Sequence, residues 1–428
     1  MPQLYSEPLR TMDHTPSSVA IATPLRYDDE LLAALALPTG KLPILRGVGS
    51  GLTRRVDDPA GTFWAVGDRG PNIKIKVAVA RFGLEHLAKY ADSDGAKVMP
   101  CPDIGPAISE LRLDGDEVVL VRSLALRDAG GRAISGLPTP GGANALTEPA
   151  VTLDGSLIPS DPSGADTEGI TAGPDGTFII GDEYGPSLLH VAADGRVLLR
   201  WVPEGLEPLF KGADYPVLGS LPAMAARRHL NRGFEGLTFS PDGTQLYLAF
   251  QSPLAHPGGH AHSQARHVRL WQLDAVTMRV SAQYIYPLDR PSSFRRDAER
   301  GEVDWSDIKV SELVMIDRER LLVLERASAT TKLYQVQIDP AYALKPEHLE
   351  MATRPTIEEL SARGDLEERV PVLEKALVLS TDDLTELDAD LEGMILLSPR
   401  TLLLVNDNDF GIEGTRTRFW RIDLAWDL

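Results

Sequence analysis

The sequence is poor in the residues that build disulfide frameworks, thiolate metal centres and membrane spans. Cys101 is the single cysteine among 428 residues, which excludes an internal disulfide and a cluster of cysteine ligands. No apolar run reaches the ~20 residues that a membrane-spanning helix needs, and residues 1–13 lack the features of a signal peptide. We therefore expect a cytoplasmic protein without a membrane partner, or a periplasmic or secreted one if a leader has been removed.

Basic residues are also few relative to acidic ones. Lys and Arg number 43 against 62 Asp and Glu, which gives a formal net charge of −19. Such a field repels phosphate backbones, so we expect no nucleic-acid partner. An acidic surface suits the capture of cations, but it commonly serves solubility alone. Charge by itself therefore leaves both interpretations open.

Long helical patterns are scarce, whereas turn residues are plentiful. The chain has 37 glycines and 32 prolines, and its short apolar runs are bounded by Pro, Asp and Gly. This pattern is typical of β-strands. Short helices are expected only in insertions, at residues 222–230 and 356–362. The sequence thus predicts an all-β fold with short helical insertions.

A repeated segment organises the chain. Residues 168–177 read EGITAGPDGT, and residues 235–244 read EGLTFSPDGT. A third copy begins at Glu392, and weaker copies begin at Ser50 and Ser311. Each copy predicts a β-hairpin, because Pro presets φ at the turn and Gly supplies the positive φ that closes it.

Further strand pairs lie between these copies, so units of four strands recur at intervals of roughly 60–80 residues, as a β-propeller requires. We predict a single propeller domain over residues 1–428 with six blades; five or seven blades also fit the spacing. The ring is expected to close through the last strand, residues 417–424, against N-terminal chain.

The hairpins are expected to bring polar side chains to one end of the ring. In a hairpin, residues equally far before and after the turn lie opposite one another, with Cβ atoms ~5 Å apart. Counting seven residues each way from Asp175 places Glu168 opposite Asp182, which Glu183 follows. The same count in the other copies adds Asp68, Glu235 with Gln251, Glu325 with Arg326, and Glu392 with Asn406, Asp407 and Asp409.

Carboxylates packed at one mouth repel each other unless a cation compensates. Ca²⁺, with six to eight oxygen ligands, suits carboxylate and amide oxygens better than zinc does, and Mg²⁺ or Mn²⁺ stays open. The alternative interpretation is purely structural: Glu-Gly and Asp-Gly pairs only mark turns. The predicted metal ligands are Glu168, Glu183, Glu235, Glu325, Glu392 and Asp407.

The motifs resemble those of the phytase-like family, described by an esterase-like activity of phytase. The matching stretches are GDRGPN at 67–72, DTEG at 166–169, GDEYGP at 181–186, NRGFEG at 231–236, LER at 324–326, LEG at 391–393 and NDNDF at 406–410. In this order they span residues ~45–425, nearly the whole chain. The resemblance implies a hydrolase of phosphate or carboxylate esters.

Other catalytic signatures are missing. The sequence contains no Gly-x-Ser-x-Gly elbow, and it has no phosphate-binding loop or dinucleotide fingerprint in a strand-turn-helix context. Four histidines cluster in a Pro-Gly-Gly loop, at positions 256, 260, 262 and 267. A transition-metal site there is a weaker alternative to a loop near the mouth that offers one histidine as acid or base.

These observations lead to the hypothesis of a calcium-dependent hydrolase of small anionic esters. The metal would polarise the ester oxygen and lower the pKa of an attacking water. The candidate bases are Asp68, Asp182 and Asp409, and the candidate anion-binding residues are Arg69, Arg232 and Arg326. A non-catalytic propeller with structural calcium, binding a ligand or protein, and a lactonase-like hydrolase are the alternatives. The oligomeric state is left open.

Overall fold

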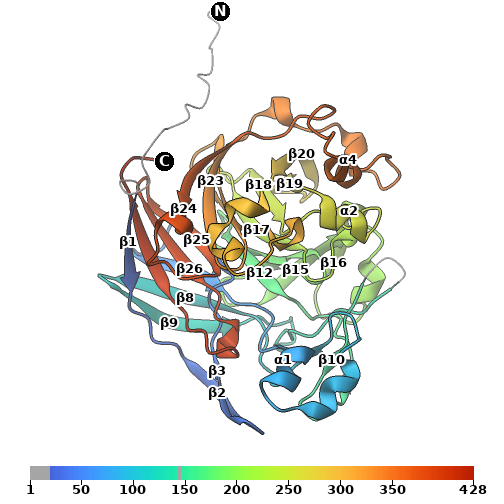
Figure 1. The fold of residues 1–428 in the computed structure, drawn as a ribbon, viewed down its shortest axis with the longest axis vertical. Helices are drawn as coiled ribbons and strands as arrows, with labels where there is room; N and C mark the ends of the chain where they lie inside the picture. Colours follow the sequence, from blue (N-terminus) through green and yellow to red (C-terminus); the bar gives the residue numbers. More distant parts are fainter. Residues whose placement is uncertain (1–19, 143–145) are drawn as a thin grey trace, which may run out of the picture.

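The computed structural model describes residues 20–142 and 146–428, and most of its strands belong to five sheets arranged around a ring (Figure 1). The innermost strand of each sheet carries one copy of the repeated segment. These strands are β4 (Gly51–Thr53), β12 (Thr167–Ala172), β17 (Phe234–Phe239), β21 (Lys309–Met315) and β25 (Leu391–Ser398). Each contacts the next, and β25 returns to β4, so the ring is closed.

The sheets extend outward from these strands, mostly by antiparallel pairing. β4 is followed by β5 (Thr62–Val66), β8 (Ala107–Asp114) and β9 (Glu117–Ala125). β12 is followed by β13 (Phe178–Asp182), β14 (Ser187–Val191), β15 (Val197–Pro203) and β16 (Val217–Leu221). β17 is followed by β18 (Gln245–Phe250), β19 (His267–Asp274) and β20 (Val280–Pro287). β21 is followed by β22 (Arg320–Arg326), β23 (Thr331–Gln337) and β24 (Lys375–Ser380).

The fifth sheet joins the two ends of the described chain. It runs from β25 through β26 (Thr401–Asn406) and β27 (Phe419–Leu424) to β1 (Ala20–Leu25). Ala20 pairs with Leu424, and Leu25 pairs with Phe419. The predicted closure of the ring by the last strand against N-terminal chain is therefore confirmed.

The described residues place five sheets in the ring, so the predicted number of six blades is not confirmed. The segments that could have supplied another blade form a separate small sheet of two-residue strands beside the ring. Its strands are β6 (Ile73–Lys74), β7 (Lys97–Val98), β10 (Ala150–Val151) and β11 (Leu157–Ile158). With α1 (Ile75–Ala80), η2 (Glu85–Tyr90) and the hairpin β2 (Leu31–Leu37) to β3 (Gly40–Leu45), this region packs around its own apolar cluster.

The remaining helices are short, as predicted. Residues 222–230 contain η4 (Ala223–Arg227), and α4 (Ile357–Arg363) begins with a capping box between Thr356 and Glu359. The others are α2 (Gly259–Gln264), α3 (Arg295–Ala298), η3 (Glu207–Phe210), η5 (Pro291–Ser293), η6 (Trp305–Asp307), η7 (Pro340–Tyr342), η8 (Pro346–Leu349), η9 (Thr381–Asp383) and η10 (Asp409–Gly411). None of the helices within 20–142 and 146–428 has the length and apolar character that a membrane crossing requires.

Glycines at the start of the repeated segments lie very close to the backbone of neighbouring innermost strands. A Cβ atom at Gly169 would lie 1.9 Å from the backbone oxygen of Glu235, and one at Gly51 would lie 2.5 Å from that of Glu168. No side chain fits at such distances from backbone atoms. Glycine therefore lets neighbouring innermost strands approach closely, and this approach also brings their glutamates together.

Candidate functional site

A β-bulge marks the start of four innermost strands. The pairing shifts register between Thr167 and Ile170, Phe234 and Leu237, Val310 and Glu312, and Leu391 and Gly393. Three of these bulges contain the glutamates of the repeated motif, which are Glu168, Glu235 and Glu392. A bulge re-aims a side chain at the end of a strand. Here the bulges turn the three glutamates toward one cavity.

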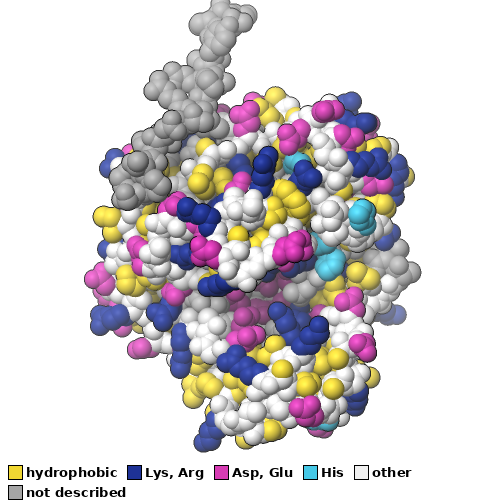
Figure 2. Space-filling model, in the orientation of Figure 1, with side chains coloured by type: hydrophobic (Ala, Val, Ile, Leu, Met, Phe, Trp, Pro, Cys, Tyr) yellow, Lys and Arg dark blue, Asp and Glu magenta, His cyan; other side chains and the backbone are white. Residues whose placement is uncertain are grey.

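The cavity has a volume of about 460 Å³, and Figure 2 shows acidic side chains inside a depression whose rim carries basic ones. It is lined by strand residues of four ring sheets, by Asp68 and Arg69 in the loop after β5, and by the small sheet beside the ring. Ten of the twelve predicted site residues lie on its wall: Asp68, Arg69, Glu168, Glu183, Arg232, Glu235, Arg326, Glu392, Asp407 and Asp409.

Asp182 and Glu325 do not line the cavity, which corrects their predicted placement at the mouth. Asp182 is buried beneath it, where it pairs with Arg200 and accepts a hydrogen bond from the Ser187 hydroxyl at 2.7 Å. Glu325 is also fully buried and pairs with Lys375 at 2.6 Å. Both carboxylates have protein partners of their own, so neither faces the cavity.

The bulges explain this error. Counting seven residues each way assumed straight hairpins, but Asp182 pairs with Thr167 rather than Glu168. Likewise, Glu325 pairs with Val310. A slip of one residue turns a side chain to the opposite face of its strand. The next residue along the chain, Glu183 or Arg326, therefore reaches the cavity instead.

Three cavity residues missed by the sequence analysis occupy equivalent positions. Asp166, Lys309 and Asp390 each stand two residues before the bulged residue of their strand, and all three line the cavity. The alternation of side chains along a strand was the signal that could have found them. Lys74 and Lys97, which the small sheet contributes, carry no comparable signal in the sequence.

Two of the three predicted anion-binding arginines are engaged by carboxylates. Arg69 pairs with Asp166 and with Glu148, the latter at 2.5 Å, and donates to the side chain of Asn231. Arg326 pairs with Glu392 and with Asp390, the latter at 2.5 Å. These guanidinium groups hold acids of the site in place.

Arg232 and Lys309 differ from them, since neither forms an ion pair within the described residues. Arg232 donates to the side-chain oxygen of Gln251 at 2.5 Å and lines the cavity. The positive charge of Arg326, burial and the charge of Arg232 together lower the pKa of Lys309 to about 8. With Lys74 and Lys97, which also form no ion pair among the described residues, Arg232 and Lys309 are the basic groups of the cavity with charge to offer a ligand.

Several buried carboxylate oxygens in the cavity receive no hydrogen bond. They are Oδ1 of Asp166, Oε1 of Glu183 and Oε2 of Glu235, on residues that are 2%, 2% and 1% exposed. Burial, followed by the charges of Glu235 and Asp68, raises the pKa of Glu168 well above its usual range. Such oxygens are costly to bury without a positive partner.

The arrangement of these oxygens fits a divalent cation. Oxygens from Asp68, Asp166 and Glu168 lie within 4.8 Å of one another, and so do oxygens from Glu168, Glu235 and Glu392. All the ligand atoms are oxygens, which suits Ca²⁺, Mg²⁺ or Mn²⁺ better than softer metals. The donor set therefore matches the hard cation predicted from the sequence.

A tight turn after β26 positions the last acids of the cavity. Burial and the neighbouring charges of Asp409 and Asp390 raise the pKa of Asp407 to about 7. Asp409 and Phe410 have positive φ values of 45° and 54°, and the ring of Phe410 is buried against Gly47. Anchoring by Phe410 holds the exposed Asp409 at the rim of the cavity.

The clustered histidines do not form a metal group in the described part of the chain. His262 is buried, its Nδ1 lies 2.6 Å from the backbone oxygen of Pro253, and its ring stacks on that of His229 at 4.4 Å. His267 lies against Ser361 instead, with 2.8 Å between Nδ1 and Oγ. Of these residues, His229 reaches the wall of the cavity.

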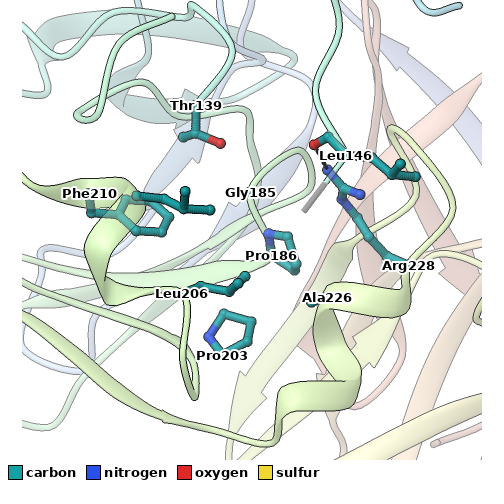
Figure 3. Close-up of a pocket in the computed structure, with 10 residues that line it drawn as sticks. Thr139, Leu146, Gly185, Pro186, Pro203, Leu206, Phe210, Ala226 and Arg228 are labelled. Atoms are coloured by element: carbon teal, nitrogen blue, oxygen red, sulfur yellow. Dashed lines mark hydrogen bonds between the residues drawn. The ribbon is translucent and has the colours of Figure 1, made fainter. Parts of the chain in front are cut away.

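A second, apolar pocket lies next to the sheet that starts with β12 (Figure 3). Leu206, Phe210 and Pro186 line it, and Arg228 borders it while donating to the backbone oxygen of Tyr184 at 2.6 Å. Its volume is about 20 Å³, which is room for little more than a water molecule. The large acidic cavity is thus the better candidate for a functional site.

A closed ring of antiparallel sheets with polar residues gathered at one mouth defines the protein as propeller-like. The chain belongs to the phytase-like family, described as esterase-like activity of phytase, whose model matches residues 45–410. The family resemblance predicted from the motifs is confirmed.

Other comparisons are more distant. An uncharacterized secreted protein of Arthroderma benhamiae is 29% identical over 252 residues, which cover 53% of this chain and 47% of that protein. The chain thus spans about half the length of this curated relative. Its name gives no support to the expected cytoplasmic location.

Two solved structures illustrate the structural matches. The PQQ-bound aldose sugar dehydrogenase of Streptomyces coelicolor is 11% identical, with a TM-score of 0.34, over 96% of this chain and 100% of that one. A streptogramin B lyase structure is 9% identical, with a TM-score of 0.32, over 95% and 98% of the two chains.

Proposed function

We propose that this protein is a divalent-cation-dependent hydrolase of small anionic esters, with Ca²⁺ as the cation. One observation carries the proposal: buried carboxylate oxygens that lack hydrogen-bond donors converge on one cavity of substrate size. Membership of the phytase-like family supports an ester or phosphoester substrate. Glu168, Glu183, Glu235, Glu392 and Asp407 are the proposed ligands retained from the sequence, and Asp68 and Asp166 join them.

When bound, such a cation polarises an ester oxygen and lowers the pKa of a coordinated water. The residues of the chain supply the rest of the chemistry. Arg232 and Lys309, which have no ion pair within the described residues, hold the substrate anion. Arg69 and Arg326 position the carboxylates with which they pair.

Asp409 is the proposed base among the three original candidates. Asp182 is excluded from this role because Arg200 and Ser187 occupy its carboxylate, and Asp68 belongs to a carboxylate group suited to a cation. Asp409 lines the cavity, is exposed and stands outside both groups. It is therefore free to accept a proton from water.

The test is an assay of the purified chain on p-nitrophenyl phosphate, bis-p-nitrophenyl phosphate and p-nitrophenyl acetate, with Ca²⁺ and with chelator. We expect turnover that chelator abolishes, and a rate at least about 100-fold lower in Glu168→Gln and Asp409→Asn. Glu299→Gln, at an exposed position, is the matched control. Circular dichroism of each variant verifies that it is folded.

An inactive wild type that still binds Ca²⁺ would overturn the catalytic proposal. It would favour a propeller whose calcium is structural and whose mouth binds a ligand or protein. Turnover of lactones in place of the three esters would instead favour the lactonase-like alternative. Full cation-dependent turnover in folded Asp409→Asn would remove Asp409 as the base.

We further propose that the protein acts outside the cytoplasm, because extracellular calcium sites work at cation concentrations of about 0.1–1 mM. The secreted relative supports this location. Fractionation of cells that produce the tagged protein from its native gene tests the proposal. Recovery in the cytoplasmic fraction alone would contradict it.

A further inference from the structure

The two carboxylate groups in the cavity share one residue. Asp68 and Asp166 meet Glu168 on one side, and Glu235 and Glu392 meet it on the other. Ca²⁺ binds oxygens at 2.3–2.6 Å, so ligand atoms on one ion lie at most about 5 Å apart. The separation of at most 4.8 Å within each group satisfies this limit. Each group is therefore the right size for an ion of its own.

Glu168 belongs to both carboxylate groups. It lies in the bulge of β12, whose neighbours in the ring are β4 and β17. Glu168 is buried, with 8% of the residue exposed. Its carboxylate nevertheless accepts no hydrogen bond and forms no ion pair within residues 20–142 and 146–428. Its carboxylate is consequently available to both groups.

Each group also contains a buried oxygen that lacks a donor. In the first group this atom is Oδ1 of Asp166, and in the second it is Oε2 of Glu235. Both residues are at least 98% buried. Leaving such an atom unpaired is unfavourable, and more so for a charged group. A cation on one side of Glu168 would satisfy one of these atoms and leave the other.

In each group, one carboxylate is paired with an arginine. Arg69 pairs with Oδ2 of Asp166, and Oδ1 of the same carboxylate has no hydrogen-bond partner. Arg326 pairs with Oε1 of Glu392 in the second group. Each arginine fixes the orientation of one carboxylate by holding one of its oxygens. The two groups thus have the same construction, and Glu168 is common to both.

The charge of the cavity agrees with two ions. Among the described residues, ten acidic and six basic side chains line it, a formal excess of four negative charges before Glu148, the partner of Arg69, is counted. Two divalent cations carry that amount of positive charge. A single divalent cation would leave two carboxylates uncompensated in a largely buried site.

We propose that the cavity binds two divalent cations of the calcium class side by side, with Glu168 as the ligand that they share. The first is held by Asp68 and Asp166, and the second by Glu235 and Glu392. This inference rests on the proposed function only in assuming that the cavity binds a divalent cation.

Equilibrium dialysis of the metal-free full chain against CaCl₂, with elemental analysis, tests the number of ions directly. We expect two equivalents per chain, and two binding events in calorimetry. Asp68→Asn should remove one equivalent, and Glu235→Gln should remove the other. Glu168→Gln should weaken both events at least about tenfold, which corresponds to 1.4 kcal/mol each. Glu299→Gln should retain two equivalents.

A wild type that binds one equivalent overturns the inference, whichever variants fold. The inference also fails if Asp68→Asn and Glu235→Gln abolish the same single event. One equivalent together with cation-dependent ester hydrolysis would refute the paired site and leave the proposed function standing. Two equivalents without any hydrolysis would support the paired site and refute the proposed function.

Discussion

Arg326, at the end of β22, donates a hydrogen bond to the carboxylate of Glu392 in the bulge of β25. The two side chains are 4% and 9% exposed, and they join neighbouring sheets at the mouth of the cavity. Arg326 also pairs with Asp390 at 2.5 Å. One guanidinium group therefore compensates two carboxylates from the adjacent sheet.

Replacing this guanidinium group should destabilise the protein. Arg326→Gln leaves Glu392 as an uncompensated buried charge, so we expect the free energy of unfolding in chelator to fall by about 3–5 kcal/mol. Added Ca²⁺ should restore part of this loss, because the cation binds only the folded chain. Urea unfolding with and without Ca²⁺ measures both effects. Arg400→Gln, in an exposed pair with Asp427, should change stability by less than about 1 kcal/mol. Equal stability of the two variants would refute the role of the pair.

Two glutamates that were predicted as metal ligands should affect different properties when they are replaced. Glu183→Gln removes a cavity oxygen that lacks a donor, so we expect calcium affinity to fall by about tenfold or more with little loss of folding stability. Glu325→Gln breaks the buried pair with Lys375, so it should lower stability by about 3–5 kcal/mol and leave calcium affinity unchanged. Calorimetry and thermal unfolding of both variants test this contrast. The reverse outcome would return Glu325 to the metal site.

His262 should make stability sensitive to mild acid. Burial lowers its pKa to about 4, while a histidine in the unfolded chain titrates near 6.5. Between these values the unfolded chain binds a proton that the folded chain does not. The contribution of neutral His262 to the free energy of unfolding is therefore fully present above about pH 6.5. It is lost as the pH falls toward 4, by about 1.4 kcal/mol per pH unit.

Urea unfolding near pH 7 and near pH 5 tests this dependence. His262→Gln should show a smaller drop in unfolding free energy between the two conditions than wild type. His260→Gln, exposed on the same helix α2, is the control and should keep the wild-type drop. Identical drops in wild type and His262→Gln would rule out His262 as the source.

Gly169 should tolerate no side chain. In Gly169→Ala the new Cβ would meet the backbone oxygen of Glu235, so the neighbouring strands must separate. We expect a loss of about 3 kcal/mol or more, at the upper end of overpacking effects, and weaker calcium binding as Glu168 and Glu235 move apart. Gly301→Ala, where nothing lies within 4 Å, is the control. Wild-type stability and affinity in Gly169→Ala would contradict the role of close approach.

Hairpin positions and ring closure could be predicted from the sequence because turns and apolar runs are local signals. Glu168, Glu235 and Glu392 were found because they repeat with the turn that follows them. The number of sheets was not found, because the strands of the small sheet, such as β6 and β7, are two residues long. A sequence signal for strands that short is too weak to show where they pair.

The errors at the site have a different cause. The exchange of Asp182 for Glu183 follows from a bulge, and a bulge depends on how a strand pairs rather than on its own sequence. The engagement of Arg69 by Glu148 could not be predicted either, because these residues are 79 positions apart. Their contact exists only once the insertion between the ring sheets has folded.

The pairing of β1 with β27 determines when the ring can close during synthesis of the chain. β1 is the first of the described strands to be synthesised, whereas its partner β27 is the last. At about 5–20 residues per second, β1 remains an unpaired edge for roughly 20–80 s. Such edges invite pairing with other chains. Asp68, Asp166, Glu168 and Glu235 emerge earlier in this interval, whereas Glu392 and Asp407 emerge at its end, with the sheet that contains β27. Completion of the carboxylate set thus waits for the synthesis of the same sheet that pairs with β1.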